Sequence, residues 1–216
     1  MVKCQENIAF SGKRKMEQTE TGFQSEKPVL NITGDKVALG PIERHMIPDF
    51  VRWENDFAVT IMSGDPLRPL SRAQMEERFA RASKEEDPRF VEFAIYERAS
   101  LRCIGTTGLR HINKTNRNAE FGIMIGEKDC WGKGYGTETT ILILDYAFSV
   151  LGLHNVLLTT SGYNERAIRA YTRAGFRFVG RQREALRLAD QVYDIVYMDC
   201  LATEFRSPLR RVVELP

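Results

Sequence analysis

Apolar residues recur with the periods of helices and strands from Lys36 onward. Apolar positions three and four apart predict an amphipathic helix, and strict alternation predicts a half-buried strand. Ser71 and Asn164 are good N-cap residues, and Gly175 suits the residue just after a helix. Helices are therefore expected over residues 47–55, 71–83, 137–151 and 164–175. Strands are expected over residues 37–39, 90–96, 102–110, 118–126, 155–161, 176–187 and 192–201.

The order of these elements predicts a fold of the α/β (α+β) class. It contains a mixed, mostly antiparallel sheet of about seven strands, with helices on both faces. Three consecutive strands without a helix between them disfavour a doubly wound parallel sheet. One domain is expected over residues 28–205. Residues 1–27 are polar and aperiodic and are expected to form a flexible tail, and residues 206–216 form a short C-terminal tail.

Composition narrows the class of protein. The chain has 216 residues with 43% hydrophobic residues, which is typical of a globular domain. The net charge of +2 argues against a protein that coats nucleic acid. The sequence has neither the long apolar run of a membrane span nor the apolar core of a secretory signal, so a cytoplasmic location without membrane contact is expected. The four cysteines and three histidines lack metal-ligand spacing, so no metal is expected.

The stretch Trp131-Gly132-Lys133-Gly134-Tyr135-Gly136-Thr137 lies between an expected strand and an expected helix. Backbone amides converge at such a junction, and the helix dipole adds about half a positive charge. Pyrophosphate is the expected occupant. The spacing fits neither the P-loop nor the dinucleotide fingerprint. A flexible connector is the alternative reading, because short glycine patterns often match by chance.

Two motifs at this separation resemble the GNAT acetyltransferase superfamily. The loop is similar to the family's Gln/Arg-x-x-Gly-x-Gly/Ala motif, although tryptophan stands at its first position here. The form Trp-Gly-Lys-Gly-Tyr is typical of the Rim-type branch, which includes ribosomal-protein, spermidine and resistance acetyltransferases. The second motif runs from Asn164-Glu165-Arg166-Ala167 through Tyr171 to Ala174-Gly175-Phe176. The resemblance covers about residues 36–203 and implies the GNAT fold.

The resemblance implies acetyl-CoA as co-substrate. Amides from Trp131 to Thr137 would hold its pyrophosphate, and Lys133 is a further candidate for a phosphate contact. Backbone groups of Ile123, Met124 and Ile125 would bind the pantetheine arm, together with Asn164. The family's strands through Ile125 and Thr160 splay apart, and the thioester lies in the gap.

The resemblance implies that Tyr171 is the general acid toward the CoA sulfur. It lies seven residues after Asn164, so both fall on nearly the same helix face. Packing the helix on the sheet is its alternative role. Glu120 is the candidate base for the amine proton, and its alternative role is a salt-bridged or solvated glutamate. Trp53, Glu54 and Asp56 lie in a Trp-x-Asn-Asp-like stretch and are candidate acceptor contacts, although ordinary surface charge is the alternative reading.

The expected activity is N-acetylation of a primary amine by direct transfer in a ternary complex. A small-molecule amine, with antibiotics or metabolites as candidates, is preferred slightly over a protein N-terminus. A non-catalytic acyl-CoA sensor is the alternative from another class, because a fold does not guarantee chemistry. A homodimer is expected by analogy alone.

Overall fold

A computed structural model describes residues 27–63, 67–84 and 87–207. The two predicted tails lie almost wholly outside these ranges, so both stay predictions. Within them the strands are β1 (Ile32–Thr33), β2 (Val37–Gly40), β3 (Val91–Glu97), β4 (Cys103–Asn113), β5 (Asn118–Ile125), β6 (Asn155–Ser161), β7 (Arg177–Leu188) and β8 (Gln191–Leu201). The helices are α1 (Ile47–Asn55), α2 (Phe57–Ser63), α3 (Arg72–Lys84), α4 (Tyr135–Asp145) and α5 (Glu165–Ala174), and a π-helical turn, Tyr146–Val150, follows α4.

In this part of the chain the strands form one sheet in the order β1-β2-β3-β4-β5-β6-β8-β7. Neighbouring strands run antiparallel except β5 and β6, which are parallel. The prediction of a mixed, mostly antiparallel sheet is therefore confirmed. The sheet has one more strand than expected, because β1 contains only two residues and is too short for alternation to reveal.

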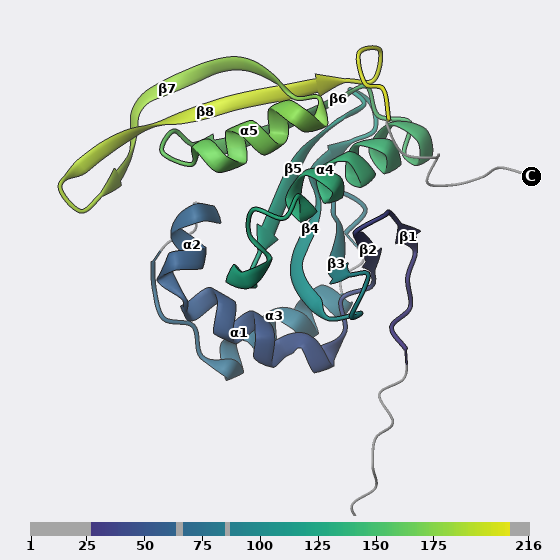
Figure 1. Cartoon of the computed structure of the whole chain (residues 1–216), viewed down its shortest axis with the longest axis vertical. Helices are drawn as coiled ribbons and strands as arrows, with labels where there is room; N and C mark the ends of the chain where they lie inside the picture. The colour runs from purple at the N-terminus through teal and green to yellow at the C-terminus, as the bar shows by residue number, and fades with distance from the viewer. Residues whose placement is uncertain (1–26, 64–66, 85–86, 208–216) are drawn as a thin grey trace, which may run out of the picture.

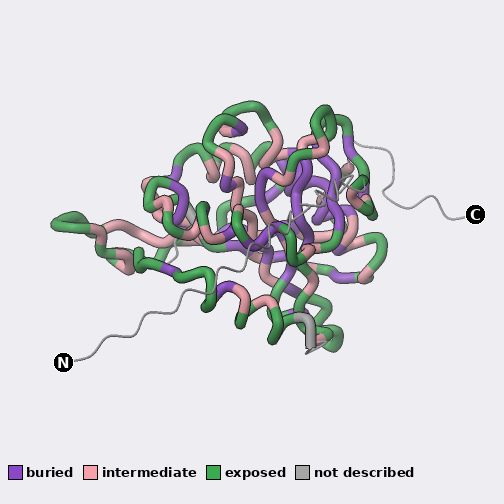
Figure 2. The backbone as a smooth tube through the Cα atoms, turned by 90° about the horizontal axis from the view of Figure 1, so that it is seen from below, coloured by how far each residue is buried: buried purple, intermediate pink, exposed green. Residues whose placement is uncertain are grey.

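Helices cover both faces of the sheet, as predicted (Figure 1). One core packs α4 and α5 against the sheet, and its fully buried residues include Leu142, Ile143 and Phe176. The other core packs α1, α2 and α3 against the opposite face, around Trp53. Figure 2 shows the buried backbone gathered at the centre of the molecule, with exposed residues around it.

Two helices differ from the prediction. The short helix α2 was not expected, although Asp56 supplies an N-cap signal by accepting a hydrogen bond from the amide of Ala58 at 3.0 Å. Helix α4 begins at Tyr135, two residues earlier than expected, because Gly134 adopts φ +88° and turns the chain directly into the helix. The glycine loop therefore ends inside the first helical turn.

The pairing between β5 and β6 is short. It joins residues 118–120 to residues 155–157, and beyond those pairs β5 continues against β4 alone while β6 continues against β8. The edge of β5 that faces β6 therefore has no strand partner after Glu120. The two strands separate there, as the resemblance implied.

Glu138 ties the first strands to the first turn of α4. Its carboxylate is 9% exposed and accepts hydrogen bonds from the amides of Lys36 at 2.7 Å and Val37 at 3.2 Å. A Cβ on Gly34 would lie 2.2 Å from the same carboxylate, so the turn before β2 packs closely on it. A carboxylate in the first turn of a helix is also favoured by the helix dipole.

Replacing Glu138 with alanine should lower the free energy of unfolding by about 1–3 kcal/mol, because buried amides would lose their acceptor. Urea denaturation measures the change. Glu77→Ala is the matched control, because among the described residues Glu77 forms only an exposed pair with Arg81, and this variant should cost less than about 0.5 kcal/mol. Equal stability of the two variants would contradict this anchoring role.

Candidate active site

The glycine loop presents backbone to solvent at the N-terminus of α4. Gly132 and Gly134 adopt φ +76° and +88°, which side chains other than glycine rarely adopt. A Cβ at Gly132 or Gly136 would meet no atom within 4 Å, so the space in front of the loop is open. Bare amides, open space and a helix N-terminus together fit a pyrophosphate group.

Three hydrogen bonds connect the loop to the rest of the fold. The Trp131 indole N–H donates to the carbonyl of Ile125 at 2.8 Å, and the Tyr135 hydroxyl donates to Glu97 at 2.6 Å. This hydrogen bond raises the pKa of Tyr135 to about 12. The Lys36 ammonium donates to the carbonyl of Lys133 at 3.2 Å, and Lys133 itself is exposed. These contacts hold the backbone of the loop in place.

A cleft opens beside the loop, where β5 and β6 separate. It holds about 880 Å³ of space between protein atoms, part of which is open solvent. Of the residues predicted to contact acetyl-CoA, Lys133 alone is not part of its lining. The others that line it are Ile123, Met124, Ile125, Trp131, Gly132, Gly134, Tyr135, Gly136, Thr137 and Asn164.

The side chain of Asn164 makes two hydrogen bonds within the protein. Its side-chain oxygen caps α5 by accepting from the amide of Ala167 at 3.1 Å, and its amide donates to the carbonyl of Met62 at 2.9 Å. The hydroxyl of Tyr163 likewise donates to the carbonyl of Ile61. The N-terminus of α5 therefore holds α2 beside the cleft.

Tyr171 lies on α5 at the inner end of the cleft. Its ring packs edge-on against Phe121 and Phe176, with centroids 6.1 and 6.0 Å away. Its hydroxyl has no hydrogen-bond partner among the described residues. Burial raises the pKa of Tyr171 to about 12, so the hydroxyl keeps its proton at neutral pH.

A second pocket adjoins the cleft. Met62, Ile123, Met124 and Tyr171 line both spaces. The charged residues of this second pocket are Glu54, Glu92 and Arg110. Its remaining polar wall consists of Thr106, Thr107, Thr159 and Thr160. The two spaces therefore meet at the place where Tyr171 lies, and we call the second one the acceptor pocket.

Besides Lys133, three of the candidate residues from the sequence lie outside both pockets. Glu120 accepts a 2.6 Å bond from Arg110 and lies 3.1 Å from the ring nitrogen of His111. Asp56 pairs with Lys128. Trp53 is 1% exposed and is part of the core under α1. Of the three acceptor contacts expected from the sequence, Glu54 alone lines the acceptor pocket.

Sequence reasoning missed Glu92, Met62 and Arg166. Glu92 lines the acceptor pocket, Arg166 lines the cleft, and Met62 lines both. Alternation placed Glu92 in a strand but could not say which helix covers that face. Arg166 belongs to the second motif, but the motif could not show that its side chain lines the cleft, because this depends on how α5 packs beside the cleft.

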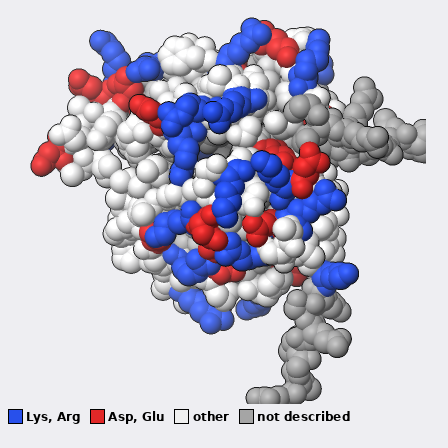
Figure 3. All heavy atoms as spheres, in the orientation of Figure 1, with Lys and Arg blue, Asp and Glu red and all other residues white. Residues whose placement is uncertain are grey.

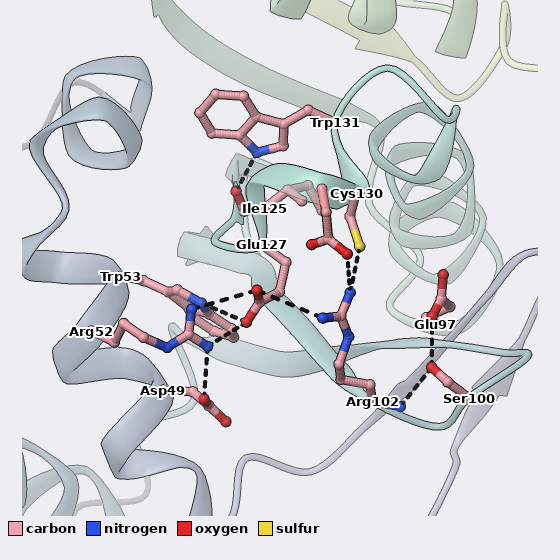
Figure 4. Close-up of polar contacts among 11 residues, drawn as sticks. Asp49, Arg52, Trp53, Glu97, Ser100, Arg102, Ile125, Glu127, Cys130 and Trp131 are labelled. Atoms are coloured by element: carbon pink, nitrogen blue, oxygen red, sulfur yellow. Dashed lines mark hydrogen bonds and ion pairs between the residues drawn. The ribbon is translucent and has the colours of Figure 1, made fainter.

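Glu127, in the segment before the glycine loop, contacts side chains of α1 and also Arg102, the residue directly before β4 (Figure 4). Its carboxylate accepts from Arg52 and from the Trp53 indole N–H at 3.1 Å, and lies 3.9 Å from Arg102. Burial by itself would raise the pKa of Glu127, but the bonds from Arg52 and Trp53 outweigh it and hold the pKa below the usual 4.5. The charged form is therefore the one that stabilises the fold.

Because its folded pKa is depressed, Glu127 should contribute stability that is present above pH 4.5 and is lost as the pH falls through the folded value. Glu127→Gln should be less stable than the wild type at pH 7, and the difference should shrink below pH 4.5. Thermal unfolding between pH 3 and 7, with Glu77→Gln as the control, measures this. A difference that does not change with pH would contradict the role of the charge.

No group of three or more His, Cys, Asp or Glu side chains in the described ranges is arranged to hold a metal ion. Within the same ranges, no helix is long and apolar enough to cross a membrane. Acidic and basic side chains are interspersed on the face shown in Figure 3. That face therefore presents no large area of one sign.

The fold places a glycine loop before α4 and a cleft where β5 and β6 separate, and comparison with known families assigns this architecture. Residues 36–177 match the family described as acetyltransferase (GNAT) domain. The match covers more than half of the chain, which therefore belongs to the GNAT acetyltransferase family.

The curated relatives carry the names of two kinds of acetyltransferase. The chain is 31% identical over 111 residues to the spermidine N(1)-acetyltransferase of Vibrio cholerae, a segment covering 51% of this chain and 64% of the relative. It is 32% identical over 103 residues to a Bacillus subtilis protein named "putative ribosomal N-acetyltransferase YdaF", covering 48% of this chain and 56% of the relative. The aligned segments thus span less than two thirds of these relatives.

Solved structures agree on the fold. The spermidine N-acetyltransferase of Vibrio cholerae in complex with CoA and spermine superposes with a TM-score of 0.72 at 24% identity, over 79% of this chain and 98% of that chain. A dodecameric structure of the same enzyme gives a TM-score of 0.66 at 26% identity, over 79% and 96%.

Proposed function

We propose that this chain transfers the acetyl group of acetyl-CoA to a primary amine of a small cationic molecule. The observation that carries the proposal is the junction of the cleft and the acceptor pocket at Tyr171. A direct transfer needs both substrates to reach one point from two sides. Membership of the GNAT family supports the same reaction.

Acetyl-CoA supplies the acetyl group as an activated thioester. The loop amides and the N-terminus of α4 bind the pyrophosphate, and the unpaired edge of β5 offers backbone groups to the pantetheine arm. The neutral amine attacks the carbonyl carbon, a carbon–nitrogen bond forms, and the carbon–sulfur bond breaks. Tyr171, which keeps its proton at neutral pH, donates it to the departing sulfur.

The charges of the acceptor pocket support a cationic acceptor. Glu54 and Glu92 provide two carboxylates against the single guanidinium of Arg110. Glu92 has no hydrogen bond or ion pair among the described residues. A carboxylate near the junction attracts an ammonium group and can accept its proton, directly or through water. Glu120 forms ion pairs with Arg110 and His111, and we assign it the role of positioning Arg110 in the wall of the acceptor pocket.

Spermidine is the first acceptor to test, because it is the named substrate of one relative. Thiol release from acetyl-CoA should be measured with spermidine, aminoglycosides, amino acids and short peptides with free N-termini. We expect the fastest turnover with a small molecule that carries two or more amines. Binding of acetyl-CoA without turnover of any acceptor would favour a sensor and contradict the proposal.

One observation favours a second candidate, a protein N-terminus. Glu92 also lines a further groove, bordered by Arg78, Arg81 and Phe90. This groove would let an extended chain continue from the acceptor pocket along the start of β3. The relative named "putative ribosomal N-acetyltransferase YdaF" supports this alternative. Turnover of peptides alone would establish it.

Tyr171→Phe should lower kcat by about 100-fold, because the sulfur would leave without a proton donor. The Kd for CoA should change by less than about threefold, since the lost hydroxyl contributes little to the bound ground state. Steady-state kinetics measures kcat, and isothermal titration calorimetry measures the Kd for CoA. Tyr197→Phe is the matched control, because its hydroxyl bonds Gln182 away from both pockets. An unchanged kcat in Tyr171→Phe would contradict the proposal that Tyr171 is the general acid.

Glu54→Gln and Glu92→Gln should each raise the KM for a diamine by about five- to tenfold, because partly screened charge pairs of this kind contribute about 1 kcal/mol. Glu77→Gln on the outer face of α3 is the control. Initial rates with a diamine and with a monoamine of equal length separate binding of the second charge from proton transfer. A KM that stays constant in both variants would contradict recognition by charge.

The dodecameric structure of the Vibrio cholerae enzyme supports the further proposal that this chain self-associates. Light scattering coupled to size-exclusion chromatography measures its mass in solution. The homodimer expected from the sequence and a larger assembly are separate outcomes of that measurement.

A further inference from the structure

Arg166 and Trp131 meet across the cleft. Arg166 lies in the first turn of α5, and its guanidinium carbon lies 4.1 Å from the centroid of the Trp131 ring. Trp131 directly precedes the glycine loop, and both side chains line the cleft. One member of the pair comes from the segment after β5 and the other from the helix after β6. The pair therefore bridges the two walls that the separated strands create.

The indole provides a fixed platform. Its N–H donates to the carbonyl of Ile125 at 2.8 Å, and Figure 4 shows this nitrogen pointing toward Ile125. The ring consequently cannot turn freely about its side-chain torsions. A guanidinium stacked on a fixed ring is held in orientation while its N–H groups at the edge stay free to bind.

The charge of Arg166 has no counterion in the part of the chain that the structure describes. It has no hydrogen bond or ion pair among the described residues, whereas Arg169 on the same helix pairs with Glu165 at 3.0 Å. The residue is exposed, although partial desolvation of the guanidinium by neighbouring atoms lowers the pKa of Arg166. A guanidinium that is exposed at the cleft and has no anion beside it can bind an anionic ligand that enters the cleft. The amides of the glycine loop, next to Trp131, favour the same kind of ligand.

We propose that Arg166, oriented by Trp131, binds the pyrophosphate of CoA from the α5 side, opposite the amides of the glycine loop. This rests on the proposed function, which places CoA in the cleft. The planar guanidinium can donate two parallel hydrogen bonds to phosphate oxygens. In this arrangement α5 provides the cation, and Trp131 before the glycine loop provides the ring that orients it.

Calorimetric titration with CoA, dephospho-CoA and S-acetyl-pantetheine tests the proposal. Arg166→Gln should weaken the binding of CoA and dephospho-CoA by about tenfold or more, the effect of a charge-assisted hydrogen bond. S-acetyl-pantetheine has no phosphate, and its binding should not change. Arg169→Gln is the matched control on the same helix and should leave all three affinities unchanged. Trp131→Leu should reduce the additional effect of Arg166→Gln, because the two side chains act as a unit.

Three results would overturn the assignment. A loss with CoA but not with dephospho-CoA would move the contact to the 3′-phosphate. Equal losses with all three ligands would show that the pair only holds the cleft walls in place. No loss with any ligand would show that Arg166 does not contact the cofactor. If the wild type bound neither CoA nor dephospho-CoA, the proposed function itself would fail, whatever the variants do.

Discussion

The parallel pairing of β5 with β6 ends after residues 118–120 and 155–157, and the candidate site depends on that break. A fully paired β5 would satisfy its own backbone groups and leave no edge for a ligand. The separation also opens the sheet, so that the cleft and the acceptor pocket meet within it at Tyr171. Neither half of the site would suffice alone, because direct acetyl transfer needs an amine and a thioester at one point.

Surrounding contacts keep the break open and its walls in place. Glu138 joins β2 to the first turn of α4, and Glu127 joins α1 to the segment before the glycine loop. Asn164 caps α5 and at the same time binds α2 through the carbonyl of Met62. Each uses a buried or half-buried polar group whose loss leaves a partner unsatisfied, which makes these contacts costly to break. The loop can therefore expose its amides without losing its shape.

Local patterns predicted most of the fold. Capping by Asn164, the turn at Gly175 and the glycine loop before α4 are set by residues close together in sequence, so they could be predicted. Contacts between distant segments could not. Glu120 alternates correctly along β5, yet its pairing with Arg110 depends on the register with β4. Glu92 gave no signal of its own, because its place in the acceptor pocket depends on which helices cover β3.

A crystal structure of the wild-type chain with CoA tests the central claim most directly. The account predicts that the pantetheine arm lies along the unpaired edge of β5, with its sulfur within hydrogen-bond distance of the Tyr171 hydroxyl. The pyrophosphate should lie against the amides of residues 131–137. A CoA molecule bound outside the gap between β5 and β6, or a sulfur that does not reach Tyr171, would contradict it.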